Sequence, residues 1–163
     1  MDPDVGALTS GDVGQGRFPE TSRILEEFSA ITDVQSDLRG RKVLVTAGGT
    51  REAIDPVRYI GNLSSGKQGY AVARSALTRG AEVTLISANS NLPDIQGVRM
   101  IKVENALQML KALEDEFSHS DILVMSAAVA DARPLQLAES KIRKSEFTNI
   151  ALIENPDLLQ TIS

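Results

Sequence analysis

Short apolar segments alternate with amphipathic segments along residues 43–125, and this alternation constrains the fold more than any other feature of the sequence. The pattern predicts strands at Val43–Val45, Glu82–Ser87, Val98–Val103 and Asp121–Met125, and helices at Tyr70–Arg79 and Asn105–Phe117. Apolar strands joined by helices pair in parallel, with right-handed crossovers. The sequence therefore predicts an α/β fold, a three-layer, Rossmann-like parallel sheet with helices on both faces.

An apolar stripe marks one side of two expected helices. In a helix expected at Thr21–Val34, the stripe consists of Ile24, Leu25, Phe28 and Ile31. In the helix expected at Tyr70–Arg79, the packing side consists of Ala71, Val72, Ser75 and Ala76. We expect Gly80 to end this second helix.

The composition excludes several classes of protein. The net charge of −5 argues against a general nucleic-acid binder, whose surface would be basic. The absence of cysteine excludes a disulfide framework and a cysteine-based zinc site, and His119 is the only histidine. No apolar run approaches the roughly 18 residues of a membrane span. The chain opens with no secretory signal, and we therefore expect a cytoplasmic protein that does not bind a membrane.

The connection from Thr46 to Val72 is long for a turn between a strand and a helix. The dinucleotide fingerprint G-x-G-x-x-G is weakly matched, because Gly48-Gly49 is followed by no further glycine at that spacing. The segment 61–67 does satisfy the phosphate-loop pattern G-x-x-x-x-G-K. However, Gln68 follows where Ser or Thr should supply a hydroxyl for Mg²⁺, and the match does not follow a strand directly.

A third interpretation explains the length by two separate binding devices. Residues 48–50 would offer backbone N–H groups at the carboxyl end of the strand, where open α/β sheets bind ligands. Residues 64–66 would offer hydroxyl and N–H groups at the start of the next helix, where the helix dipole favours an anion. Arg58 and Asn62 lie between them and could face a carboxylate or a phosphate. An ordinary surface loop with a serine cap stays open as the alternative.

Several long motifs occur in one order: VLVTAGGTREAIDPVRYIGNLSSGKQGYAVA, GAEVTLIS, SAAVADARP, KIRK and ENPDLL. From about Arg41 to the end, they closely resemble the phosphopantothenate–cysteine ligase family. That family usually has Ser where this chain has Gly61, so the resemblance implies that the phosphate-loop match is accidental. It also implies that residues 41–163 are the N-terminal part of the ligase domain, truncated at its C-terminus.

The segment SGDVGQGRF resembles the last motif of a flavin-dependent decarboxylase, which bacteria usually fuse in front of the ligase. Asp12, Gly14, Gly16 and Arg17 match this motif, whereas Ser10 replaces its reactive Cys and Phe18 replaces its Met. The resemblance implies that residues 1–40 are a remnant of the decarboxylase domain plus a linker. FMN would belong only to the missing part of that domain.

The resemblance implies a ligase of coenzyme A biosynthesis that joins 4′-phosphopantothenate to cysteine. CTP is the usual activator, with Mg²⁺, and the reaction passes through an acyl cytidylate. The implied catalytic residues are Lys141, Asn62 and Arg58. The implied CTP-binding residues are Gly48, Gly49, Thr50, Ser64, Ser65, Gly66, Met125, Ser126, Ala127, Asp131, Lys141, Ile153, Glu154, Asn155 and Pro156. Asp131 is also the implied metal residue, and the whole ligase domain is expected to form a homodimer.

Two classes of function remain open at this stage. The first is the ligase or its nucleotide-binding part, which is the function we predict. The second is a non-catalytic Rossmann-like module that binds a nucleotide or a partner. Release of pyrophosphate in the presence of phosphopantothenate, CTP, Mg²⁺ and cysteine distinguishes them.

Overall fold

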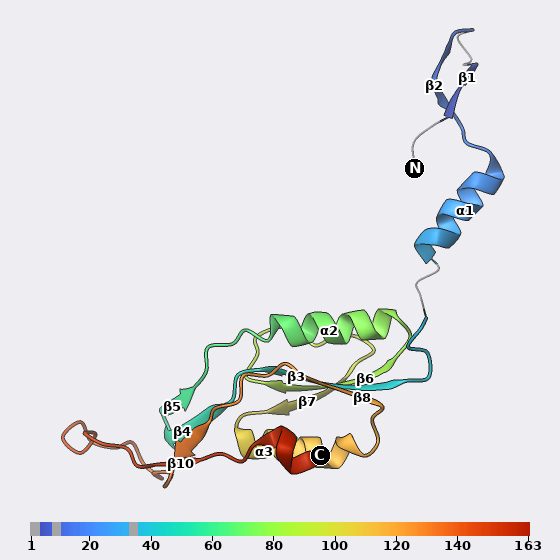
Figure 1. Cartoon of the computed structure of the whole chain (residues 1–163). Helices are drawn as coiled ribbons and strands as arrows, with labels where there is room; N and C mark the ends of the chain where they lie inside the picture. Colours follow the sequence, from blue (N-terminus) through green and yellow to red (C-terminus); the bar gives the residue numbers. More distant parts are fainter. Residues whose placement is uncertain (1–3, 8–10, 33–35) are drawn as a thin grey trace. The chain divides into compact units, whose positions relative to one another are not determined.

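The computed structural model describes residues 4–7, 11–32 and 36–163. It contains two compact units, Met1–Ser36 and Asp37–Ser163. In the smaller unit, β1 (Asp4–Ala7) and β2 (Val13–Arg17) form an antiparallel pair, and α1 spans Thr21–Thr32 (Figure 1). Ser10 and the last two residues of the expected helix, 33 and 34, lie outside the described residues.

The apolar stripe predicted for α1 is only partly packed within its own unit. Leu25 and Phe28 are exposed, and Ile24 is half-buried. The side chain of Ile31 lies outside the described part of the chain. The helix prediction therefore holds for residues 21–32.

The larger unit is built on a four-stranded parallel sheet of order β7-β6-β3-β8. Its strands are β3 (Lys42–Gly48), β6 (Glu82–Ala88), β7 (Arg99–Val103) and β8 (Ile122–Met125). The central strand β3 pairs with β6 on one side and with β8 on the other. The predicted α/β fold with a parallel sheet packed against helices is confirmed.

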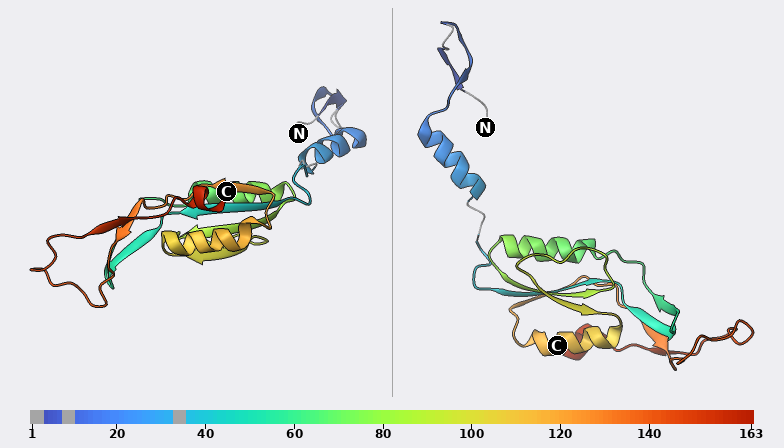
Figure 2. Two further views of the ribbon diagram at one scale, coloured as in Figure 1. Left: turned by 60° about the horizontal axis from the view of Figure 1, so that its bottom comes forward. Right: turned by 180° about the vertical axis from the view of Figure 1, so that it is seen from behind.

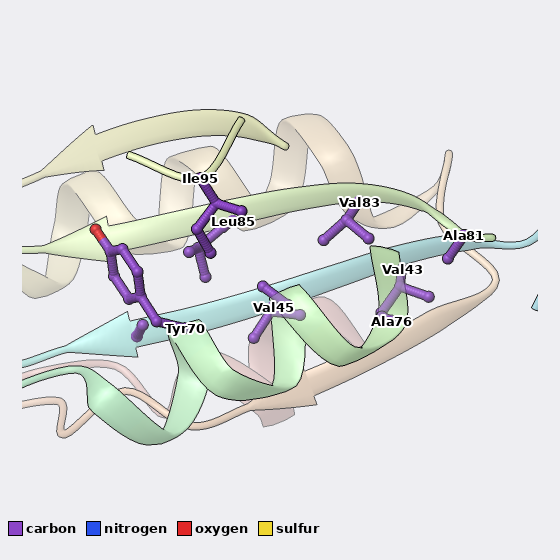
Figure 3. Packing of buried hydrophobic residues seen from close by; sticks show 10 residues of the cluster. Val43, Val45, Tyr70, Ala76, Ala81, Val83, Leu85 and Ile95 are labelled. Atoms are coloured by element: carbon purple, nitrogen blue, oxygen red, sulfur yellow. The ribbon is translucent and has the colours of Figure 1, made fainter. Parts of the chain in front are cut away.

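Successive residues of β3 point to opposite faces of the sheet, because a strand has a period of two residues. Val43 and Val45 pack against α2 (Lys67–Thr78), and Figure 3 shows them beside Tyr70 and Ala76 of that helix. Leu44 packs in a separate cluster with α3 (Ala106–Phe117). Figure 1 shows these two helices on opposite sides of the sheet.

The predicted packing side of α2 is wrong at two positions. Ala71 and Ser75 are exposed, whereas the buried residues of the helix are Gly69, Tyr70, Ala73 and Ala76. The buried set repeats at the three- and four-residue spacing of a helical face, but this face is rotated from the one predicted. Tyr70 belongs in the core because its hydroxyl lies 3.0 Å from Ser87 Oγ, which gives the buried phenol a polar partner.

The connection between β3 and α2 has its own secondary structure, which the sequence analysis treated as loop. Here β4 (Arg51–Asp55) and β5 (Arg58–Gly61) form an antiparallel hairpin. A second antiparallel pair, β9 (Ala132–Pro134) and β10 (Leu152–Glu154), contacts it through β4. Both pairs lie beyond the carboxyl end of β3 (Figures 1 and 2). The long connection is therefore structured, as a hairpin separate from the parallel sheet.

The chain closes with a short helix, α4 (Leu158–Ile162), which packs on α3 through the buried Leu158. Asp157 caps this helix by accepting the N–H of Gln160 at 3.0 Å. No helix in the described ranges has both the length and the apolar character needed to cross a bilayer.

The turn at the end of β3 generates a prediction about stability. Gly48 has a φ of 85°, and a Cβ added there would lie 1.9 Å from the carbonyl oxygen of Ala88. Gly40 has a similar φ of 76°, but a Cβ added there meets nothing within 4 Å. Gly40→Ala should cost roughly 1–2 kcal/mol for the left-handed conformation. Gly48→Ala should cost about 1–3 kcal/mol more for the clash.

Urea unfolding of the two variants and the wild type measures both losses. An equal loss of unfolding free energy in Gly40→Ala and Gly48→Ala contradicts this account of the turn.

Candidate functional site

The candidate site lies where β3, β6 and β8 end at one edge of the sheet, the edge at which open α/β sheets bind ligands. The Gly48-Gly49 turn joins these three ends. The N–H of Gly49 donates to Ala88 O at 3.1 Å, and the N–H of Ala128 donates to Gly48 O at 2.8 Å. The turn is therefore fixed to both neighbouring segments by backbone hydrogen bonds.

These backbone hydrogen bonds correct the expectation that residues 49 and 50 offer free N–H groups. The N–H groups of Gly49 and Thr50 were predicted to face a ligand, but the first donates to Ala88 and the second donates to Ala128 O at 3.1 Å. They are occupied because the chain continues the parallel pairing past the end of β3. The glycines serve close packing instead, since a Cβ at Gly49 would lie 2.6 Å from Asn62 O.

The Ser64–Gly66 segment lies directly against this turn. A Cβ on Gly66 would lie 3.3 Å from Gly48 N, and one on Gly49 would lie 3.4 Å from Ser64 Cβ. Gly66 is the N-cap of α2, with a φ of 77° and no side-chain hydrogen bond. The start of α2 therefore presents the positive end of a helix dipole, an environment that favours an anion.

A cavity of about 280 Å³ opens at this helix start. It is lined by Leu63, Ser64, Ser65, Gly66, Lys67, Gln68 and Ser126. Ser64 and Ser65 bond only weakly within the segment, because their hydroxyls accept the N–H groups of Gly66 and Lys67 at a long 3.4 Å each. Weakly engaged hydroxyls can turn toward a bound oxyanion.

Ser126 forms the opposite wall and is held by Thr46. The buried hydroxyl of Thr46 accepts the N–H groups of Ser126 and Ala127, at 3.0 and 3.1 Å, where the chain leaves β8. Ser126 Oγ is itself buried and has no hydrogen-bond partner among the described residues. Buried hydroxyls are rarely left unpaired. A ligand oxygen in the adjoining cavity would satisfy this hydroxyl.

Thr50 and Asn62 hold the segment that follows Ser126. Thr50 is fully buried, and its hydroxyl accepts the N–H of Ala130 at 2.9 Å. The exposed Asn62 donates through Nδ2 to Val129 O at 3.0 Å. Thr50 therefore holds this segment from within the core, whereas Asn62 holds it from the surface.

A second cavity, of about 410 Å³, is lined in part by that segment. Its lining consists of Met125, Val129, Ala130, Asp131, Glu154, Asn155, Pro156, Asp157, Leu158 and Leu159. The structure thus brings predicted site residues from two parts of the chain into one cavity. Met125 and Asp131 come from the first part, and residues 154–156 come from the second. Ile153 is exposed beside this cavity's lining residues but is not among them.

The side chain of Asn155 forms hydrogen bonds within the protein through both its amide nitrogen and its amide oxygen. Its Nδ2 donates to Ala130 O at 2.8 Å, and its Oδ1 accepts Arg133 Nη1 at 2.9 Å. Arg133 also donates to Glu154 O at 2.8 Å. Arg133 was missed by the sequence analysis, because nothing in the sequence shows that β9 and β10 are paired. It shapes the wall of the second cavity.

Arg58 and Lys141 are not among the lining residues of either cavity, and they lie in segments that contact each other. Arg58 forms an ion pair with Asp55 at 2.7 Å and donates to Ile142 O at 3.2 Å. Its guanidinium carbon lies 4.2 Å from the centre of the Phe147 ring. Lys141 is exposed, next to Ile142. Asp55, which the sequence analysis quoted only as part of the connection, is therefore the partner of a predicted site residue.

The carboxyl group of Asp55 is buried, and its environment holds it in the charged form. Burial alone would raise its pKa, but N–H groups of Val57 and Ile142 and the guanidinium of Arg58 together hold the pKa below the usual value for Asp. Asp55 is thus a carboxylate at neutral pH.

Comparison with known proteins places this geometry in a family. Residues 38–163 match the model described as DNA/pantothenate metabolism flavoprotein C-terminal domain. The coenzyme A biosynthesis bifunctional protein CoaBC of Mycobacterium tuberculosis H37Rv is 50% identical over 169 residues, 98% of this chain and 40% of that protein. The CoaBC of Vibrio cholerae is 43% identical over 167 residues, 99% of this chain and 41% of that protein. The chain thus spans about two fifths of the length of these relatives.

Solved structures agree with the sequence matches. A crystal structure of the C-terminal domain of CoaBC superimposes with a TM-score of 0.69 at 40% identity, covering 78% of this chain and 60% of that one. Cab2 H337A, solved in complex with phosphopantothenate-cysteine, superimposes with a TM-score of 0.64 over 86% of this chain and 65% of that one. Its identity of 19% shows the likeness of the fold alone.

The Thr46 hydroxyl provides a test of the cavity wall. Thr46→Val keeps the shape of the side chain but leaves the part-buried N–H groups of Ser126 and Ala127 without this acceptor, at a cost of roughly 1–3 kcal/mol each. Thr50→Val leaves only the N–H of Ala130 unpaired and is the matched control. We expect Thr46→Val to lose about twice as much unfolding free energy in urea as Thr50→Val. A smaller loss in Thr46→Val than in its control contradicts the role of Thr46.

Proposed function

The chain belongs to the family of DNA/pantothenate metabolism flavoprotein C-terminal domains, and on this premise we propose that it is the ligase part of an enzyme of coenzyme A biosynthesis. The reaction joins 4′-phosphopantothenate to the amine of cysteine after activation by CTP. The sequence motifs already identified this family, and the comparisons confirm it. The activity is proposed from the family together with the site described above.

The single observation that supports this proposal best is that a helix start without a side-chain cap shares a cavity with a serine whose buried hydroxyl has no partner among the described residues. Gly66 at the start of α2 and Ser126 Oγ after β8 line one cavity. A triphosphate is polyanionic and rich in acceptor oxygens, so it fits both features. We place the phosphates of CTP there.

The second cavity suits the rest of the nucleotide, and Asp131 lies in its lining. No cluster of three His, Cys, Asp or Glu side chains that could hold a metal occurs in the described part of the chain. A single carboxylate still fits Mg²⁺, because this ion keeps several waters and is usually bound by one or two carboxylates together with substrate phosphates. When bound, Mg²⁺ would neutralise charge on the triphosphate, with Asp131 as its protein ligand.

The reaction proceeds in two steps in this proposal. The carboxylate of 4′-phosphopantothenate attacks the α-phosphorus of CTP, and pyrophosphate leaves. The amine of cysteine then attacks the acyl carbon, CMP leaves, and the amine loses a proton. Lys141 balances the charge that gathers on the α-phosphate, while Asn62 holds the acyl cytidylate. Arg58 lies on the side of the phosphopantothenate.

The remaining expectations concern the larger protein and follow from the same family. We propose that residues 1–40 are the end of a flavin-dependent decarboxylase domain plus a linker, with FMN bound elsewhere in that domain. We also propose that residues 41–163 begin a ligase domain of three-layer, Rossmann-like form that dimerises and works in the cytoplasm. Asp12, Gly14, Gly16 and Arg17 match the decarboxylase motif.

The charge of Lys141 should matter for the first step. In the protein as encoded by its whole reading frame, Lys141→Gln should slow pyrophosphate release without cysteine by about a hundredfold, or roughly 3 kcal/mol. Lys144→Gln removes an exposed charge from the same segment and should have little effect. Similar rates in wild type and Lys141→Gln would exclude this role. No pyrophosphate release by the wild type would favour a non-catalytic nucleotide-binding module.

Asn62 should matter for the second step. Asn62→Asp places a negative charge beside an anionic intermediate, so capture of the acyl group by cysteine should fall more than CTP binding does. Asn62→Ala loses the bond to Val129 O without adding charge and separates the two effects. Product formation with cysteine is compared with pyrophosphate release without it. If both steps fall equally in Asn62→Asp, the assignment is wrong.

A further inference from the structure

We propose that Asp55 is a positioning residue that fixes the basic segment Lys141–Lys144, and with it Lys141, relative to the β4–β5 hairpin. It does so through Arg58 and Ile142, and it contacts no reacting atom. The importance of Lys141 for the reaction rests on the function proposed above, whereas the contacts of Asp55 do not.

Asp55 is placed at the end of β4 with its side chain fully enclosed, at 0% exposure. Its Oδ1 accepts the N–H of Val57 at 2.9 Å, which closes the turn of the hairpin. Its Oδ2 accepts Arg58 Nη1 at 2.7 Å and the N–H of Ile142 at 3.2 Å. One carboxylate thus binds the hairpin turn and a segment 87 residues further along the chain.

Arg58 binds the second backbone group of Ile142, its carbonyl. We call these contacts of Asp55 and Arg58 with Ile142 the clamp. Arg58 Nη1 donates to Ile142 O at 3.2 Å while it pairs with Asp55. Both backbone groups of Ile142 are therefore held by a single ion pair. The guanidinium also lies over the ring of Phe147, 4.2 Å from its centre, which adds a contact beyond the C-terminal end of the basic segment.

The neighbouring residues of the segment point outward. Lys141, Arg143 and Lys144 are exposed, whereas Ile142 is half-buried. Upstream, the N–H of Ala138 donates to Ile54 O at 3.0 Å, next to Asp55. Ile54 and Asp55 therefore both anchor this part of the chain to the hairpin. Since Lys141 directly precedes Ile142, its backbone position depends on this clamp.

A buried carboxylate would be unfavourable without partners, and removing one partner of such a pair leaves an uncompensated charge. Asp55→Asn keeps the size of the side chain but removes its charge and puts an NH₂ group near the donors of Arg58 and Ile142. We therefore expect the variant to release Ile142. The β5 strand of the same hairpin leads to Asn62, so the clamp also ties the position of Lys141 to that of Asn62.

Glu52→Gln provides a matched control. Glu52 is a second buried carboxylate on β4, but its Oε1 accepts the N–H of Ala106 at the start of α3, at 2.9 Å. Its substitution perturbs the same strand without touching residues 141–147. Any effect of general destabilisation of the hairpin should therefore occur in both variants.

The first measurement is hydrogen exchange of the peptide spanning residues 141–147 in the protein as encoded by its whole reading frame. We expect Asp55→Asn to speed exchange there about tenfold or more, which corresponds to roughly 1.4 kcal/mol of lost protection. Glu52→Gln should leave exchange of this peptide unchanged. Unchanged exchange in Asp55→Asn, or equal acceleration in both variants, overturns the proposal.

The second measurement is pyrophosphate release without cysteine, together with CTP binding. A misplaced lysine should slow release ten- to about a hundredfold, while CTP affinity stays within about twofold. If exchange accelerates but even the wild type releases no pyrophosphate, the clamp stands and the proposed ligase function fails. If wild type is active and Asp55→Asn exchanges faster at an unchanged rate of release, Asp55 does not position Lys141.

A further variant covers the case in which Asp55→Asn does not fold. Arg58→Lys keeps a positive charge beside Asp55 but lacks the guanidinium Nη1 that donates to Asp55 and to Ile142 O. Faster exchange of residues 141–147 in this variant supports the clamp. Exchange equal to that of the wild type contradicts it.

Discussion

The parallel pairing of β3 with both of its neighbours is the constraint on which the rest of the larger unit depends. Because β6 and β8 flank the same strand, β6 ends beside Gly48, and the chain that follows β8 reaches Gly48 through the N–H of Ala128. The chain can turn there only with a residue that tolerates a φ of 85° and the close approach of Ala88. From this point, the start of α2 and the loop after β8 are brought to opposite sides of one cavity.

The hairpin between β3 and α2 explains why that connection is long. A short turn would take the chain from the end of β3 straight into the helix. The hairpin instead adds Thr50, Asp55 and Asn62, each of which bonds to a segment at least 67 residues further along the chain. Two of these bonds hold the loop around Ala130, and the third holds the basic segment. The extension therefore supports the proposed chemistry from outside the parallel sheet.

Much of the parallel sheet could be predicted from local patterns, because its strands are short apolar runs separated by helices. The packing side of α2 could not, since residues 69–76 contain small residues on several sides of the helix and Tyr70 was expected to be a boundary. The β4–β5 hairpin was also missed, because charged residues interrupt its alternation and its buried carboxylates find partners elsewhere in the fold. Ser64–Gly66 lies against the glycine turn because both flank the connection between the first strand and its helix.

The sequence by itself determined the family, the parallel α/β sheet and the candidate residues at its carboxyl edge, because these depend on motifs and on short-range periodicity. Only the tertiary structure decided which polar groups are free to meet a ligand. In the folded chain, the N–H groups of Gly49 and Thr50 and the side chain of Asn155 are engaged in hydrogen bonds, whereas Ser126 Oγ has no hydrogen-bond partner among the described residues. The physical reason is that hydrogen-bond partners such as Thr46 with Ser126, or Asp55 with Ile142, lie 80 or more residues apart and meet only when the sheet is assembled.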